Sequence, residues 1–136
     1  MKLIYSKKYP DKLLHLINRC EEIIKRTNVS PEEQFLQLAT LKMNCGDTFK
    51  PHQHIWKKFS GLEVIAQESW VVIKGSVKIF MYDVDGSLLD EDIIYPGDCS
   101  MTFEGGHNYE SLEDNTIVYE YKTGPYTGIE NDKVFL

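Results

Sequence analysis

The stretch Gly46-Asp47-Thr48-Phe49-Lys50-Pro51-His52-Gln53-His54 is the most informative part of this chain. Its first two residues are typical of a turn, and the residues after them predict a strand over 48–56. Because side chains alternate across a strand, His52 and His54 project to the same face, roughly 7 Å apart along the backbone. Two imidazoles at this spacing can converge on one metal ion. The alternative is a pair of histidines on a solvated strand face.

The rest of the chain from residue 34 has the same pattern of short strand-like runs separated by turn residues. Short runs rich in Val, Ile, Tyr, Phe and Thr are bounded by Gly, Pro, Asp and Asn, which predicts strands and turns. Asp85-Gly86 is the strongest hairpin turn signal. Closely spaced strands in one small domain favour an all-β sandwich or barrel, with the jelly roll a leading candidate. The expected strands cover residues 35–43, 48–56, 64–74, 77–83, 88–95, 99–103, 108–112 and 116–122.

The segment from residue 10 to about 26 has a different pattern. Its apolar residues recur at intervals of three and four, which predicts one amphipathic α-helix between Pro10 and the loop signal at 27–31. We expect this helix to pack against the core of the domain or a subunit interface. The predicted organisation is a single domain, with an N-terminal helical segment over 1–33 and a β-domain with a C-terminal tail over 34–136.

Composition limits the classes of partner. The 136 residues are 42% hydrophobic and 26% charged, as in one globular domain. The net charge is −6, with acidic residues spread along the chain. A nucleic-acid surface needs a basic stripe and an anionic membrane attracts basic residues, so we expect neither partner. A small molecule is the expected ligand.

The cysteines and the N-terminus point to the cytoplasm. Cys20, Cys45 and Cys99 are odd in number, widely spaced and without a CxxC pair, so we expect reduced, structural thiols and neither disulfides nor a thiolate zinc site. The apolar stretch after Met1 is too short for a signal peptide, and no apolar run reaches about 18 residues. We therefore expect a cytoplasmic protein.

Two further spacings of glycine, glutamate and histidine match the sequence motifs of a known protein family. Gly46 precedes His52 by six residues, and Glu68 is followed by six residues and then Gly75. His107 follows Tyr95-Pro96-Gly97-Asp98 and Gly105-Gly106. With these features, residues 35–122 resemble the cupin family, whose motifs are G-x5-H-x-H-x(3,4)-E-x6-G and G-x5-P-x-G-x2-H-x3-N.

The resemblance implies a jelly-roll β-barrel with a metal site inside it. By this resemblance, His52, His54, Glu68 and His107 are the ligands of one divalent transition metal. Glu63 is the competing carboxylate, and the spacing to Gly75 favours Glu68. Three imidazoles and a carboxylate suit Fe, Mn, Ni or Zn and leave positions open for a ligand. The alternative is a polar cavity lined by histidines without a metal.

Several side chains are expected around this site. Trp70 shares a strand face with Glu68, so it is a candidate pocket wall or a core residue. Trp56 follows His54 in phase, so it is a candidate for the pocket rim or for packing under the long hairpin before Glu68. Tyr109 is a candidate pocket donor. Glu120, in the run 116–122, is a candidate general base or a partner of a ligand histidine. The alternative is a structural glutamate that is paired or solvated.

Three functions are compatible with this set of residues. The sequence contains no hydrolase triad, phosphate loop or dinucleotide motif, so any chemistry belongs to the metal. The first function is a metal-dependent enzyme, isomerase-like or epimerase-like, on a small oxygen-rich, sugar-type molecule, with the metal as Lewis acid and a place in carbohydrate metabolism. The others are a non-catalytic sensor or accessory module and an Fe(II) dioxygenase. The family resemblance also implies a homodimer.

Overall fold

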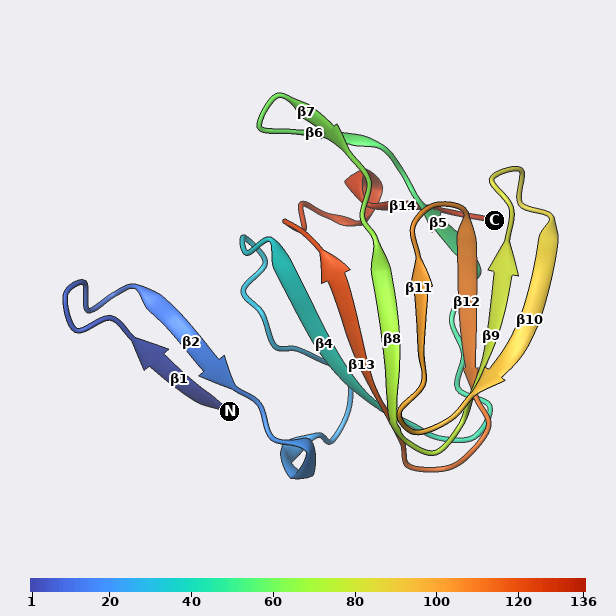
Figure 1. Cartoon of the computed structure of the whole chain (residues 1–136), viewed down its shortest axis with the longest axis horizontal. Helices are drawn as coiled ribbons and strands as arrows, with labels where there is room; N and C mark the ends of the chain where they lie inside the picture. Colours follow the sequence, from blue (N-terminus) through green and yellow to red (C-terminus); the bar gives the residue numbers. More distant parts are fainter.

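The structure is a computed structural model that describes Met1–Leu136, and it is built almost wholly of strands (Figure 1). Neither of its two short 3-10 helices has the length or apolar character needed to cross a membrane. The strands and 3-10 helices are β1 Lys2–Tyr5, β2 Leu13–Ile17, η1 Cys20–Glu22, β3 Thr27–Asn28, β4 Leu36–Met43, β5 His52–His54, β6 Lys57–Phe59, β7 Leu62–Val64, β8 Glu68–Lys74, β9 Val77–Tyr82, β10 Leu88–Ile94, β11 Cys99–Thr102, β12 Gly106–Ser111, β13 Thr116–Thr123, η2 Ile129–Asn131 and β14 Lys133–Phe135.

Two five-stranded antiparallel sheets make up the body of the molecule. The first, here called the histidine sheet, has the order β10-β9-β12-β5-β14. The second, here called the glutamate sheet, has the order β11-β8-β13-β4-β3. Buried side chains of both sheets form one core cluster, so the sheets pack face to face. The cluster contains Ala39, Leu41, Met43, Trp70, Val72, Val77, Ile79, Tyr109 and Val118.

The inner faces of the central strands change from apolar to polar along their length. In β8, the buried residues are Val72, Trp70 and then Glu68. In β13, Val118 is followed by Glu120 on the same inner face. One end of the interior is therefore an ordinary hydrophobic core, and the other end holds buried ionisable groups that need partners.

The strands expected from residue 34 onward are confirmed as β4, β5 and β8–β13. The run 48–56 forms only the short strand β5, because Pro51 has no N–H for the ladder and Thr48 makes an isolated bridge to Glu110. The run 64–74 yields β8 and the last residue of β7, the second strand of the small β6–β7 hairpin. Strand β14 lies in the tail, where the sequence predicted no strand.

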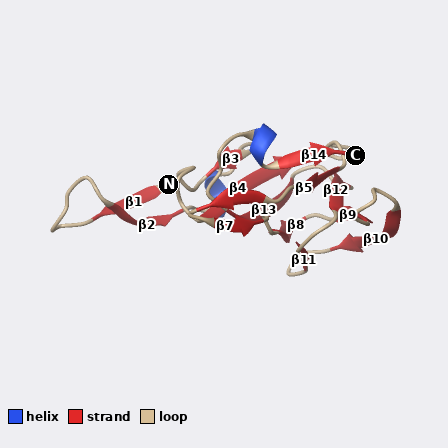
Figure 2. Ribbon diagram, turned by 90° about the horizontal axis from the view of Figure 1, so that it is seen from above, coloured by secondary structure: helices blue, strands red, loops and turns tan.

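The predicted N-terminal helix over 10–26 is wrong. Leu13–Ile17 forms β2 and pairs with β1, and the chain makes a single 3-10 turn at Cys20–Glu22. The hairpin extends away from both sheets (Figures 1 and 2), and Leu14, Ile17 and Ile24 are exposed. A helix gains most of its stability by burying its apolar stripe, and no surface here covers one.

The three cysteines, which the sequence predicted to be structural thiols, are not bonded to one another. They are also exposed, so none of them packs in the core.

Candidate metal centre

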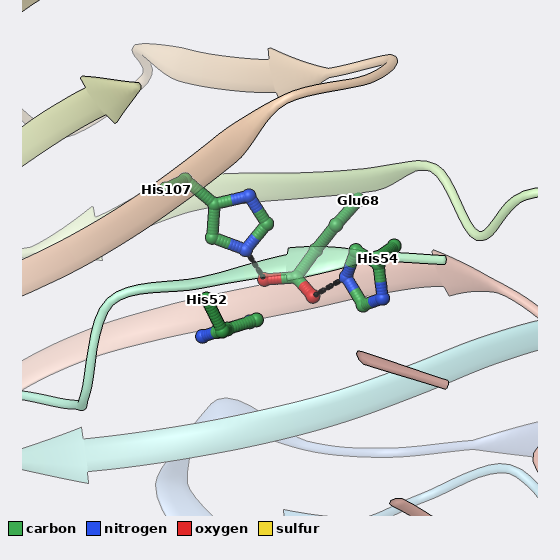
Figure 3. A group of neighbouring side chains, drawn as sticks. All are labelled: His52, His54, Glu68 and His107. Carbon is green, nitrogen blue, oxygen red and sulfur yellow. Dashed lines mark hydrogen bonds and ion pairs between the residues drawn. The ribbon is translucent and has the colours of Figure 1, made fainter. Parts of the chain in front are cut away.

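Four buried side chains meet at the polar end of the interior. His52 and His54 come from β5 and His107 from the neighbouring strand β12, whereas Glu68 comes from β8 in the glutamate sheet (Figure 3). One ligand atom of each residue lies within 4.8 Å of those of the other three. The group therefore joins the two sheets across the interior.

Strand register places these side chains. His107 lies directly opposite His52, and their ring centroids are 4.6 Å apart. His54 follows on the same face of β5, with its ring centroid 5.6 Å from that of His107. Glu68 begins β8, opposite Thr102 of β11 and Lys122 of β13. No two elements alone could build this site.

Two glycines of the sequence motifs allow the turns that fix these strands. Gly75, between β8 and β9, has a φ of +81°, a backbone conformation that glycine adopts without steric cost. Gly105, just before β12, has a φ of +84°, and an added Cβ would lie 2.6 Å from the carbonyl oxygen of Tyr82. The strand that holds His107 can therefore approach β9 only because residue 105 has no side chain.

Backbone carbonyl groups orient two of the imidazoles. His52 Nδ1 donates to the carbonyl oxygen of Lys50 at 3.0 Å, and His54 Nδ1 donates to that of Asp132 at 3.2 Å. With Nδ1 as the donor, Nε2 is the nitrogen that each ring offers to the centre. Ring orientation fixed by such a partner is a recurrent feature of histidine metal sites.

The unpartnered ring of His107 indicates that the four buried side chains are arranged to hold a cation. Its Nδ1 and Nε2 are buried, and neither has an aligned hydrogen bond. Nε2 lies 3.2 Å from Glu68 Oε1, which is close enough for an ion pair but lacks the direction of a hydrogen bond. A buried polar atom without a partner is costly, and a metal at the centre would satisfy this one. Three imidazole nitrogens and one carboxylate oxygen fit a divalent transition metal with positions left open.

Aromatic residues hold the carboxylate of Glu68. Trp70 Nε1 donates to Glu68 Oε1 at 3.0 Å, and the indole stacks on Tyr109 with centroids 3.9 Å apart. Burial would raise the pKa of Glu68, but the facing His107 and His54 outweigh it and hold that pKa well below its usual value. Glu68 is therefore an ionised group ready to accept a cation.

The two histidines of β5 differ in protonation. Burial, followed by smaller effects of the neighbouring His107 and Lys133, lowers the pKa of His52 to about 4. Burial would also lower the pKa of His54, but the carboxylates of Asp132 and Glu68 outweigh it and raise that pKa to about 8. At neutral pH, His54 is protonated in the metal-free protein and donates from Nε2 to Glu68 Oε2, 3.2 Å away.

The C-terminal segment supplies two groups that the sequence did not indicate. Asp132 is 1% exposed, and its Oδ2 lies 3.0 Å from Lys122 Nζ and 3.4 Å from His54 Nδ1. Burial would raise the pKa of Asp132, but His54 and Lys122 hold it below its usual value. Lys133 Nζ lies 3.5 Å from His52 Nε2, and burial followed by Lys122 lowers its pKa.

No local signal could have identified these two residues. Asp132 reaches His54 across 78 positions of sequence, and no motif links the two.

Glu120 is buried, but it is not a free base. Its carboxylate forms a two-pronged ion pair with Arg26, with Nη2–Oε1 at 2.7 Å and Nη1–Oε2 at 3.0 Å. The position beside a ligand histidine that was expected for Glu120 is taken by Asp132. A bidentate pair of this kind fixes both oxygens of the carboxylate by charge-assisted hydrogen bonds.

The other predicted pocket residues divide into two groups. Trp70 and Tyr109 line the main cavity, of about 310 Å³, together with His52, Glu68 and Glu120. Trp56 is 56% exposed and lines a separate cavity of about 240 Å³ beside the β6–β7 hairpin, which is the second of its two expected positions, and it is absent from the lining of the main cavity. Glu63 is exposed on β7, away from the histidines.

Comparison with known proteins bears on the fold. No protein-family model matches the sequence, and no curated protein matches it significantly. Solved structures do match. CapF with the inhibitor 3-isopropenyl-tropolone is 19% identical with a TM-score of 0.60, covering 74% of this chain and 28% of that chain. KdgF from Halomonas sp. is 20% identical with a TM-score of 0.56, covering 83% of this chain and 90% of that chain.

A third similar structure is oxalate decarboxylase from Bacillus subtilis, at 20% identity and a TM-score of 0.57. The match covers 82% of this chain and 27% of the decarboxylase. This chain therefore spans only about a quarter of CapF and of the decarboxylase, but nearly all of KdgF. The neighbours are cupins, and the chain has the cupin fold, with a His-His-Glu-His group in its interior.

Proposed function

We propose that this protein is a metal-dependent enzyme that acts on a small, oxygen-rich molecule of the sugar type. The observation that carries the proposal is the convergence of His52, His54, Glu68 and His107 within 4.8 Å beside a cavity of about 310 Å³. Cavities of this size take small molecules. Among the neighbours, CapF is bound to an inhibitor, and oxalate decarboxylase is named for a small oxygen-rich acid.

In this mechanism a divalent ion, when bound, supplies Lewis acidity toward substrate oxygens. The chain's own residues hold and orient the reacting groups. His52 and His54 keep their rings fixed through the carbonyl groups of Lys50 and Asp132. Trp70 fixes one oxygen of Glu68. Tyr109 and Trp70, stacked and buried, exclude water from the apolar side of the cavity.

Metal content is the direct test of the site. We expect His52→Ala and His107→Ala to lose the metal that the wild-type protein retains after purification, measured by inductively coupled plasma mass spectrometry. His15→Ala is the matched control, because His15 is exposed on the N-terminal hairpin. Wild-type metal content in both cavity variants would contradict the proposed site.

The carboxylate ligand has its own matched pair of variants. Glu68→Gln should lower metal content, because the amide oxygen carries no charge, whereas Glu63→Gln should not. The reverse result would return the ligand role to Glu63.

The second candidate function is a non-catalytic binding module. The observation that favours it is the ion pair between Arg26 and Glu120, which leaves that carboxylate without a free base role. Nuclear magnetic resonance of the metal-loaded protein with a panel of sugars and sugar acids separates the two candidates: turnover supports the enzyme, and line broadening without conversion supports the module. Oxygen uptake by the Fe(II)-loaded protein would indicate the dioxygenase.

We also propose that the protein is a homodimer that uses the N-terminal hairpin. An isolated two-stranded hairpin is marginally stable in water, and here it exposes Leu3, Tyr5 and Leu14. A second copy that covered these side chains would stabilise it. Light scattering should give twice the chain mass for the wild type and the chain mass after deletion of residues 1–17; a monomeric wild type would contradict the dimer.

A further inference from the structure

The cavity contains one cation without a carboxylate partner. Three positively charged side chains line it: Arg26, Lys122 and Lys133. Arg26 is paired with Glu120 at 2.7 Å, and Lys122 is paired with Asp132 at 3.0 Å. Lys133 forms no ion pair, and its only polar contact is with His52 Nε2 at 3.5 Å.

A metal bound to His52 would remove the contact between Lys133 Nζ and His52 Nε2. His52 Nδ1 is committed to the carbonyl oxygen of Lys50, so Nε2 is the only lone pair that His52 can offer to an ion. Once His52 ligates through Nε2, the half-buried ammonium of Lys133 has no acceptor among the protein groups around it. A cation in this position is stable only with an anionic or strongly polar partner.

Lys133 also lines the same cavity as His52 and Glu68. It is opposite His54 in the ladder between β14 and β5, and its Nζ lies beside a ligating nitrogen. A molecule that fills an open position on the ion is therefore within reach of the ammonium. Glu68 neutralises only half of a divalent charge, so the metal and Lys133 together favour a negatively charged molecule.

We infer that Lys133 binds the acidic group of the substrate, and that the substrate is a small carboxylic acid with a hydroxyl or carbonyl oxygen next to its carboxylate. The inference rests on the proposed function, because the neighbouring oxygen is the one that would meet the metal. A carboxylate fits better than a phosphate, since a phosphate carries nearly two charges and needs several donors, whereas only one cation here is free. The cavity of about 310 Å³ limits the acid to a small one.

The test uses the cobalt-loaded full-length chain and two probes of nearly equal size, glycolate and its neutral analogue glycolamide. Calorimetry should show glycolate binding about tenfold or more tightly than glycolamide, which is the ratio expected for a charge-assisted contact. Lys133→Met should lower this ratio several-fold by weakening glycolate alone, with the remainder due to the metal, and Lys133→Arg should restore much of it. Lys58→Met is the matched control, because Lys58 is exposed on β6, and it should behave as wild type.

The possible failures are distinguishable. Visible absorption reports bound cobalt before any probe is added, so an absence of bound cobalt in the wild type overturns the proposed function and this inference with it. If cobalt binds but glycolate and glycolamide bind equally, or if Lys133→Met keeps the wild-type ratio, the inference alone is overturned. Inorganic phosphate that binds more tightly than glycolate would overturn the choice of a carboxylic acid.

Discussion

The two ends of the chain are both short strands, and they have opposite relations to the site. At the N-terminus, β1 and β2 pair only with each other and stand away from the body (Figure 2). At the C-terminus, the three residues of β14 pair with β5, with Lys133 opposite His54 and Phe135 opposite His52. The longer element is peripheral and the shorter one completes the metal centre. The position of a strand in a sheet therefore matters more here than its length.

The largest expected effect comes from removing the C-terminal element. Deletion of residues 129–136 takes away the Asp132 carbonyl that holds His54 and leaves β5 as an unprotected edge strand. We expect metal affinity to fall by about 100-fold or more, because losing one residue that orients a metal ligand already lowers affinity by about 10–100-fold and this deletion removes several. Competition with a chromogenic chelator measures this affinity.

Deletion of residues 1–17 is the matched control at the other end. It removes a larger segment that touches no metal ligand, so metal affinity should stay at the wild-type value. If the two deletions have equal effects on affinity, the contrast between the chain ends is wrong.

A single substitution tests the same contrast more finely. Asp132→Asn should lower metal affinity about tenfold, because it removes the charge behind His54 and leaves Lys57 and Lys122 without their carboxylate. Asp11→Asn, in the loop of the N-terminal hairpin, should leave the affinity unchanged. The same chelator competition measures both, and equal affinities would show that Asp132 has only a packing role.

Proton release on metal binding is the next prediction. The pKa of His54 is about 8 in the metal-free protein, so this ring is protonated at pH 7 and must lose its proton to ligate. His52, with a pKa of about 4, is already neutral and contributes nothing. Binding should therefore release about one proton at pH 7 and few at pH 9, so that apparent affinity rises with pH between them.

Calorimetry in two buffers with different ionisation enthalpies counts these protons. Asp132→Asn should reduce the release at pH 7, because His54 loses the carboxylate that raises its pKa. Equal release at pH 7 and pH 9 would contradict the raised pKa of His54.

The smallest effect is expected in the N-terminal hairpin. Leu3 is 43% exposed, so Leu3→Ser should change the free energy of unfolding by no more than about 0.5 kcal/mol. Urea titration at low protein concentration, where a weak dimer dissociates, measures it. A loss of several kcal/mol would show that the hairpin belongs to the core of the monomer.

Much of the fold could be predicted because its signals are local. Alternating apolar residues bounded by turn residues predicted the strands that became β4 and β8–β13, and the His52-x-His54 spacing predicted two rings on one face. The N-terminal helix was predicted wrongly because apolar residues such as Leu13, Leu16 and Ile17 fit a helical period and a short strand equally well. The choice between these depends on which surface is available to bury them, and that surface is not encoded nearby.

The order of the residues was enough to predict the strand pattern and the three histidines, and to reduce the carboxylate ligand to two candidates. The folded chain was needed to show that Glu68, and not Glu63, faces the histidines, that Glu120 is bound to Arg26, and that Asp132 and Lys133 belong to the site. Each of these outcomes joins groups from different strands, as with Arg26 and Glu120, which are 94 residues apart. A buried charge must find its partner in space, and the packing of the two sheets determines which charges come within reach.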